Sequence, residues 1–178
     1  EYTLDLMSLL FKPLFHADHI AKKIKDIKFL ILDVDGVMTD GGMYWTESGD
    51  QIKKFNTKDG LGILGLTKKG FKVGIISSGF TKIMVQKRAE LLGISHCYVG
   101  QEPKLDILKT WCTELGLSLH QVAIIGDDIN DLELMKNIGL AACPSDAVNE
   151  VKSVCSIILS TKGGEGCIRE FIDAYLQK

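Results

Sequence analysis

Short apolar runs that end in polar clusters recur along this chain. They do not alternate polar with apolar residues, so each would form a strand covered on both faces, as is typical of a parallel sheet. The predicted strands are Phe29–Leu32, Val73–Ile76, Val122–Ile125, Gly139–Ala142 and Ile157–Leu159.

Segments with helical periodicity separate these strands. Several end at a glycine with a basic residue nearby, as at Gly70, which is a helix C-terminal signal. The predicted helices are Asp59–Lys69, Thr81–Leu92, Leu105–Leu115 and Leu132–Asn137. The alternation of strands and helices predicts an α/β, doubly wound (Rossmann-like) fold around the parallel sheet.

Three segments lie outside this alternation. The stretch Gly42–Asn56 is interpreted as a β-hairpin insertion, and Gly163–Gly166 as a flexible loop before a final helix, Ile168–Leu176. Residues 1–27 are expected to form an N-terminal extension, with a loosely ordered apolar tail and an amphipathic helix, Ala17–Ile27. The remaining residues, 28–178, have the length of a single domain.

Composition and charge exclude several functions. The 178 residues include 21 basic and 23 acidic side chains, scattered along the chain, which argues against a nucleic-acid-binding surface. The longest stretch without a charged residue, Leu115–Gly126, is too short for a membrane-spanning helix, which needs about 20 residues. The residues Glu1–Asp5 lack the basic start of a signal peptide. Five cysteines without a C-x-x-C pair favour reduced thiols in the cytoplasm.

The polar clusters contain the residue types of a phosphate-handling site. The carboxyl ends of parallel strands meet at one edge of a sheet, where ligands bind. Carboxylates crowded at that edge repel one another, so they favour a hard cation such as Mg²⁺, while hydroxyl and ammonium donors suit a phosphate group. A carboxylate beside the metal can attack phosphorus, and a second can act as acid and base. The clustered residues are Asp33, Asp35, Ser77, Ser78, Lys104, Asp127 and Asp128.

These clusters resemble the four motifs of the haloacid dehalogenase superfamily. The segment Asp33–Thr39 reads DVDGVMT, and the other three motifs follow in order at Ser77, Lys104 and Gly126–Asp131. The resemblance implies an Asp33 nucleophile and an Asp35 general acid/base. It implies that Ser77, Ser78, Gly79 and Lys104 bind the phosphoryl group. The implied metal residues are Asp33, Asp35 (through its main-chain carbonyl), Asp127 and Asp128, with Asp131 as an alternative to Asp128.

The spacing of the motifs leaves no room for a cap domain, since 41 residues separate Asp35 from Ser77 and 26 separate Ser77 from Lys104. The hairpin, Phe55–Gly60 and Gly163–Glu170 are similar to the capless 3-deoxy-D-manno-octulosonate 8-phosphate phosphatases. This resemblance implies a sugar-acid phosphate substrate, lipopolysaccharide inner-core synthesis, and substrate contacts from Asn56 and Asp59. It also implies a homotetramer with the hairpin and Gly163–Gly166 at its subunit contacts.

Two alternatives stay open. Members of this family often carry an arginine after the second motif, but Phe80 stands at that position here, and Glu165 lies in the glycine-rich segment. Both features are similar to phosphatases of nine-carbon keto-deoxy sugar phosphates. The other alternative is a phospho-accepting receiver module, which also combines acidic residues, a hydroxyl and a lysine. In receivers the lysine comes last, whereas Lys104 precedes Asp127 and Asp128.

Overall fold

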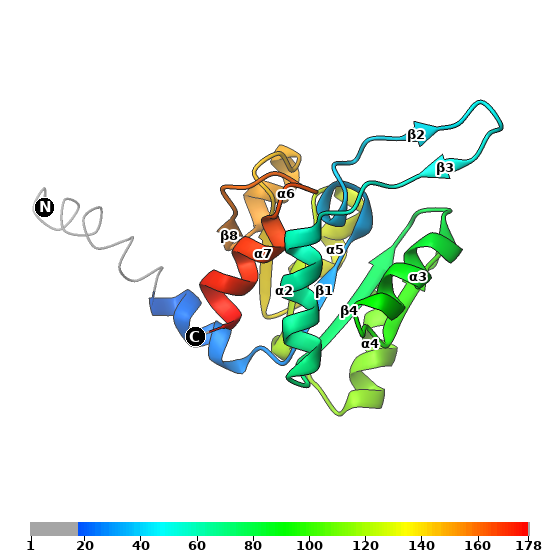
Figure 1. Ribbon diagram of the computed structural model, residues 1–178. Helices are drawn as coiled ribbons and strands as arrows, with labels where there is room; N and C mark the ends of the chain where they lie inside the picture. The colour runs from blue at the N-terminus through cyan, green and yellow to red at the C-terminus, as the bar shows by residue number, and fades with distance from the viewer. Residues whose placement is uncertain (1–17, 178) are drawn as a thin grey trace, which may run out of the picture.

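The computed structural model describes residues 18–177 and contains one six-stranded sheet, all of whose strands are parallel (Figure 1). The strand order is β5-β4-β1-β6-β7-β8, so β1 lies between β4 and β6 at the centre. The strands are β1 (Phe29–Leu32), β4 (Lys72–Ser77), β5 (His96–Val99), β6 (Val122–Ile125), β7 (Leu140–Cys143) and β8 (Ile157–Ile158). The chain therefore crosses over between strands, and helices fill both faces.

Helices cover the sheet on both sides. One face carries α2 (Thr57–Lys68), α3 (Lys82–Leu91) and α7 (Cys167–Phe171), which continues as a wider turn over Ile172–Leu176; the other carries α4 (Lys104–Leu115), α5 (Leu132–Lys136) and α6 (Asn149–Val154). Successive side chains of β1 point to opposite faces of the sheet, so β1 contributes to the hydrophobic core on each face. Leu30 and Leu32 pack toward α2 and α7, whereas Phe29 and Ile31 pack toward α4 and α5. The predicted doubly wound α/β fold is confirmed.

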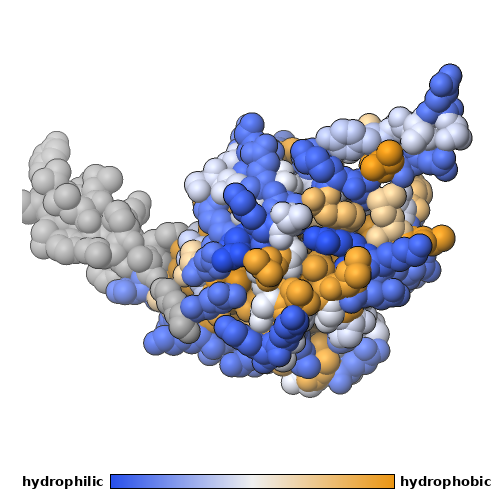
Figure 2. Space-filling view, in the orientation of Figure 1, coloured by the Kyte–Doolittle hydropathy of each residue, from blue (hydrophilic) through white to orange (hydrophobic). Residues whose placement is uncertain are grey.

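The predicted β-hairpin is present as a separate two-stranded antiparallel ribbon, β2 (Tyr44–Trp45) and β3 (Gln51–Ile52). It projects away from the body of the molecule (Figure 1). Its side chains are largely exposed, with Trp45 at 59% and Ile52 at 53%. Figure 2 shows further apolar residues on the same face of the molecule, below the hairpin. Among residues 18–177 the hairpin is the one insertion between β1 and β4, and no cap domain is present.

The predicted N-terminal helix is seen over residues 18–26. Ile20 and Ile24 pack against the α2–α7 core, so this helix is attached to the sheet domain rather than separate from it. Ala17 and the predicted apolar tail lie outside the described residues. None of the helices in residues 18–177 is long and apolar enough to cross a membrane.

The glycine-rich segment Gly163–Gly166 packs against its own chain, and its place at a subunit contact stays a prediction. Gly163, Gly164 and Gly166 are buried within their own chain, and only Glu165 is exposed. The Gly164 N–H donates to the carbonyl of Val37, at 2.9 Å. A side chain on Gly163 would overlap the carbonyl of Gly36, so glycine is required for this close approach. The segment supports the turn Val34–Met38 after β1, which we call the β1 turn.

Candidate active site

A polar cavity of about 390 Å³ opens at the carboxyl ends of β1, β4 and β6. Parallel strands direct their ends, and the first residues after them, to this one edge. The cavity is lined by Asp33, Asp35, Ser77, Ser78, Gly79, Asp127, Asp128, Ile129 and Asn130. Seven of these nine residues belong to the set predicted from the sequence.

The β1 turn positions the two aspartates of the first motif. Asp33 directly follows β1 and its N–H donates to the carbonyl of Ile125 at 3.1 Å, which continues the pairing with β6. Gly36 then adopts a φ of 87°, in the left-handed region that favours glycine. A side chain at Gly36 would also overlap the carboxylate of Asp127. The β1 turn therefore packs directly against Asp127, one of the metal-binding candidates, and Asp35 lies at the rim of the cavity.

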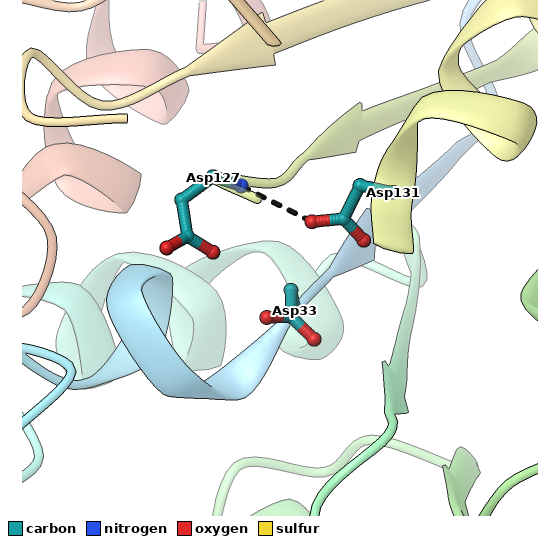
Figure 3. Close-up of side chains that lie close together, drawn as sticks. All are labelled: Asp33, Asp127 and Asp131. Carbon is teal, nitrogen blue, oxygen red and sulfur yellow. Dashed lines mark hydrogen bonds between the residues drawn. The ribbon is translucent and has the colours of Figure 1, made fainter. Parts of the chain in front are cut away.

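Three carboxylates meet beside this turn. One carboxylate oxygen from each of Asp33, Asp127 and Asp131 lies within 4.8 Å of the other two, and Figure 3 shows the three residues side by side. Asp131 lies at the start of α5, is fully buried, and accepts a hydrogen bond from the N–H of Asp127 at 3.1 Å. We call these residues the carboxylate cluster.

Lys104, the first residue of α4, lies behind the carboxylate cluster. Its side chain is 4% exposed, and Nζ donates to Oδ1 of Asp33 and to Oδ1 of Asp131, each at 2.7 Å. Burial alone lowers the pKa of this ammonium, but Asp33 and Asp131 raise it above its ordinary value, so the group stays charged. Lys104 is not among the residues that line the cavity. In the free protein it therefore orients Asp33 rather than facing the space for a phosphate.

Lys104 neutralises only part of the negative charge of the carboxylate cluster. Burial, then Asp131, raise the pKa of Asp33 to about 7, against the lowering effect of Lys104. Burial, then Asp33 and its acidic neighbours, raise the pKa of Asp127 to about 8. Oδ1 of Asp127 is buried and has no hydrogen-bond partner within residues 18–177. Repelling carboxylates with an unused oxygen are the donor set that a hard divalent cation fits.

The opposite wall of the cavity comes from the end of β4. Ser77 is buried, and its Oγ accepts a hydrogen bond from the Gly79 N–H at 3.1 Å. Ser78 lies half-buried at the rim, where the Asn130 amide donates to its hydroxyl at 3.3 Å. Hydroxyl groups and turn N–H groups of this kind can donate to phosphate oxygens.

Asp128, a predicted metal residue, lies outside the carboxylate cluster, and two predicted substrate residues besides Lys104 do not line the cavity. Asp128 lines the cavity but is exposed, and its carboxylate accepts from the N–H of Ile129 at 2.7 Å, so Asp131 and not Asp128 completes the cluster. Asn56 and Asp59, at the start of α2, do not line the cavity. The Asn56 amide donates to Gly164, and Asp59 accepts from the N–H of Arg169 at 2.7 Å, so both anchor the C-terminal segment.

Sequence reasoning missed Lys53, whose ammonium pairs with the carboxylate of Asp35. Lys53 follows β3 in the hairpin, and no motif marks it. It also missed Ile129 and Asn130 as cavity residues, although both lie inside the fourth motif. Position within that motif is the signal that could have found them.

A buried carboxylate cluster beside a lysine, at the switch between β1 and its neighbours, defines a haloacid dehalogenase-like hydrolase. A model of the haloacid dehalogenase-like hydrolase family matches residues 61–139. The chain is 38% identical to the 3-deoxy-D-manno-octulosonate 8-phosphate phosphatase of Yersinia pestis over 160 residues, which cover 90% of this chain and 85% of that relative.

Solved structures agree with this assignment. The phosphatase of the same name from Moraxella catarrhalis, in complex with magnesium, phosphate and KDO, superposes with a TM-score of 0.85 at 35% identity, covering 89% of this chain and 90% of that one. A cobalt-bound form from Haemophilus influenzae gives 0.81 at 37% identity, covering 87% and 90%. The chain belongs to the family of 3-deoxy-D-manno-octulosonate 8-phosphate phosphatases, and is a hydrolase of phosphate monoesters.

Proposed function

We propose that the protein hydrolyses 3-deoxy-D-manno-octulosonate 8-phosphate in a Mg²⁺-dependent reaction through an aspartyl-phosphate intermediate. The observation that carries the proposal is the carboxylate cluster, with Asp33 held by Lys104 at 2.7 Å and facing a cavity rimmed by Asp35. The named relatives and the KDO-bound structure from M. catarrhalis support the sugar.

The reaction uses two carboxylates in turn. An oxygen of Asp33 attacks phosphorus, and the phosphorus–oxygen bond to the sugar breaks. Asp35 gives its proton to the departing sugar oxygen, which avoids a free alkoxide. Asp35 then takes a proton from water, and that water oxygen attacks the aspartyl-phosphate, which releases inorganic phosphate and restores Asp33.

Asp33 and Asp127 would hold the magnesium ion, because each has an oxygen that is not bound by Lys104 or by Asp131. Asp131 uses its two oxygens for Lys104 and for the Asp127 N–H, so its part is to position the other two. When bound, Mg²⁺ supplies positive charge that offsets the repulsion between carboxylates and the charge on the phosphoryl group.

Replacing the nucleophile tests the mechanism. Asp33→Asn keeps the size of the side chain and should abolish phosphate release while the protein stays folded by circular dichroism. Asp106→Asn is the matched control, because Asp106 is an exposed residue on α4 that pairs with Lys109. It should hydrolyse the substrate at the rate of the unmodified protein. Retained turnover in Asp33→Asn would sink the assignment of the nucleophile.

Two alternative functions, a different sugar phosphate substrate and a signalling module, can be tested by experiment. Phe80 in place of the family arginine favours a nine-carbon keto-deoxy sugar 9-phosphate as the alternative substrate. Values of kcat/KM on the two sugar phosphates, measured side by side, decide between them. A receiver-like signalling module would hold its phosphate rather than turn over, so steady phosphate release with Mg²⁺ eliminates that reading.

We also propose that the protein is a homotetramer and that it acts in the cytoplasm, in lipopolysaccharide inner-core sugar synthesis. In this proposal residues 28–178 form one capless domain and residues 1–27 form an extension. The exposed side chains of the hairpin support the oligomer, since Tyr44, Trp45 and Ile52 are 42%, 59% and 53% exposed among residues 18–177. A hollow of about 690 Å³ lies between the hairpin and α3, with Phe80 on its wall. Light scattering of the intact chain tests this, and a monomeric mass would contradict it.

A further inference from the structure

The carboxylate of Asp35 is held by a lysine from the hairpin. Lys53 follows β3 and its ammonium pairs with Oδ1 of Asp35. Its side chain is 10% exposed, whereas that of Asp35 is 44% exposed. Within residues 18–177 Lys53 is the one cation paired with Asp35. A long side chain that is ordered and mostly buried at the rim of a cavity has lost rotamer entropy that its contacts must offset.

The pair with Lys53 involves Oδ1 of Asp35, so the other oxygen, Oδ2, remains for a different contact. A side chain on Gly79 would place its first carbon 3.1 Å from Oδ2 of Asp35 and 3.3 Å from Oγ of Ser77. Oδ2 therefore lies close to Gly79 after the end of β4, and Asp35, Ser77 and Gly79 line the same cavity. With Oδ1 fixed by Lys53, the carboxylate has one oxygen for orientation and one for proton transfer.

The next residue along the chain offers a natural comparison. Lys54 pairs with Asp40 at 2.7 Å, and Asp40 also accepts from the hydroxyl of Tyr44 at 2.8 Å. This second ion pair joins the two arms of the hairpin but is 60% exposed on the lysine side and does not involve a cavity residue. Consecutive lysines thus make two ion pairs at the base of the hairpin, and only that of Lys53 reaches the site.

We infer that Lys53 is a positioning residue for the general acid, and that the hairpin thereby sets the orientation of Asp35. The inference rests on the proposed function, because it needs Asp35 to protonate the leaving oxygen. A sugar oxygen leaves poorly without that proton. A p-nitrophenolate leaves readily without one. An Asp35 carboxylate that has lost its orientation should therefore affect the two kinds of ester differently.

Lys53→Met tests this in the intact chain with Mg²⁺. We expect kcat/KM on the sugar phosphate to fall by about 10- to 100-fold, part of the 10²- to 10⁴-fold that general acid catalysis contributes. The same constant on p-nitrophenyl phosphate should change by less than about threefold. Lys53→Arg keeps a cation at the rim and should restore most of the loss. Lys54→Met, the matched control, should leave both constants near those of the unmodified protein.

Other outcomes overturn the inference. An equal loss on both esters in Lys53→Met would mean that the lysine acts by attracting the phosphate. If kcat/KM on the sugar phosphate fell as much in Lys54→Met as in Lys53→Met, any loosening of the hairpin base would be enough to lower activity, and the pair with Asp35 would have no special part. If Lys53→Met is unfolded by circular dichroism, the ratio of the two constants in Lys53→Arg and Lys53→Gln decides. The proposed function fails separately, when the unmodified protein releases no phosphate or Asp33→Asn remains active.

Discussion

Gly36→Ala should damage the site far more than its small size suggests. Gly36 has a φ of 87°, and a side chain there would overlap the carboxylate of Asp127. The overlap is with the oxygen and carbon atoms of that carboxylate. To admit the methyl group, either Asp127 or the β1 turn must move, and both belong to the proposed metal and nucleophile geometry.

Comparison with Gly49→Ala separates the loss of stability in Gly36→Ala into a backbone part and a packing part. Gly49, at the hairpin tip, has the same φ of 87° but no atom within 4 Å of the added carbon. Both variants should lose about 1–2 kcal/mol at most from the left-handed backbone conformation. Gly36→Ala adds about 1–3 kcal/mol of overpacking. At about 2–4 °C per kcal/mol for a chain of this size, its Tm should lie about 2–12 °C below that of Gly49→Ala.

Calorimetry and steady-state kinetics on the two variants check this reasoning. A displacement of about 1 Å at a reacting group can lower the rate about 10²-fold, so kcat/KM of Gly36→Ala should fall by at least that factor. The Mg²⁺-dependent rise in its Tm should also shrink. Gly49→Ala should keep the kcat/KM and the Mg²⁺-dependent rise in Tm of the unmodified protein. If Gly36→Ala matched Gly49→Ala in Tm, in its response to Mg²⁺ and in turnover, close packing of the turn against Asp127 would be irrelevant to the site.

The remaining predictions concern charge and anchoring. Asp33 and Asp127 have raised pKa values, about 7 and about 8, so the folded protein binds more protons than the unfolded chain between those values and about pH 4. The free energy of unfolding should therefore fall as pH rises through that range in EDTA, and Mg²⁺ should raise Tm most at pH 8; no rise there would refute a metal site. Asp59→Ala leaves the N–H of Arg169 unpaired and should cost about 1–3 kcal/mol in urea unfolding. Exposed Asp106→Ala should stay within about 0.5 kcal/mol of the unmodified protein.

The centre of the fold could be predicted because its strands are buried on both faces. In β1 and β6 every residue is buried, and the sequence accordingly reads as unbroken apolar runs. The polar residues that follow such runs must lie at the sheet edge, so Asp33, Ser77 and Asp127 could be placed together before any coordinates. Strand β5 was missed because all four of its residues are only partly buried, which weakens the apolar signal.

The finer parts of the site depend on local geometry that spacing does not encode. Asp128 and Asp131 are both carboxylates of one motif, but Asp131 is buried beside Lys104 whereas Asp128 is exposed and accepts from the N–H of Ile129. The pair between Lys53 and Asp35 joins residues 18 apart through the base of a hairpin, and no periodicity marks such a contact. Likewise, the buried place of Lys104 behind Asp33 follows from packing of α4 against the sheet.

The support of the β1 turn by Gly163 and Gly164 has a consequence for how the protein is made. The turn is synthesised well before the backbone groups on which it rests, because the contact between Cys167 and Val37 spans 130 residues. A nascent chain that has emerged only as far as β8 contains every strand of the parallel sheet, but its β1 turn lacks the contacts with Gly163 and Gly164. The proposed catalytic centre can therefore assemble only after Gly163 and Gly164 have been synthesised, and chains that stop before them carry Asp33 without the supported turn.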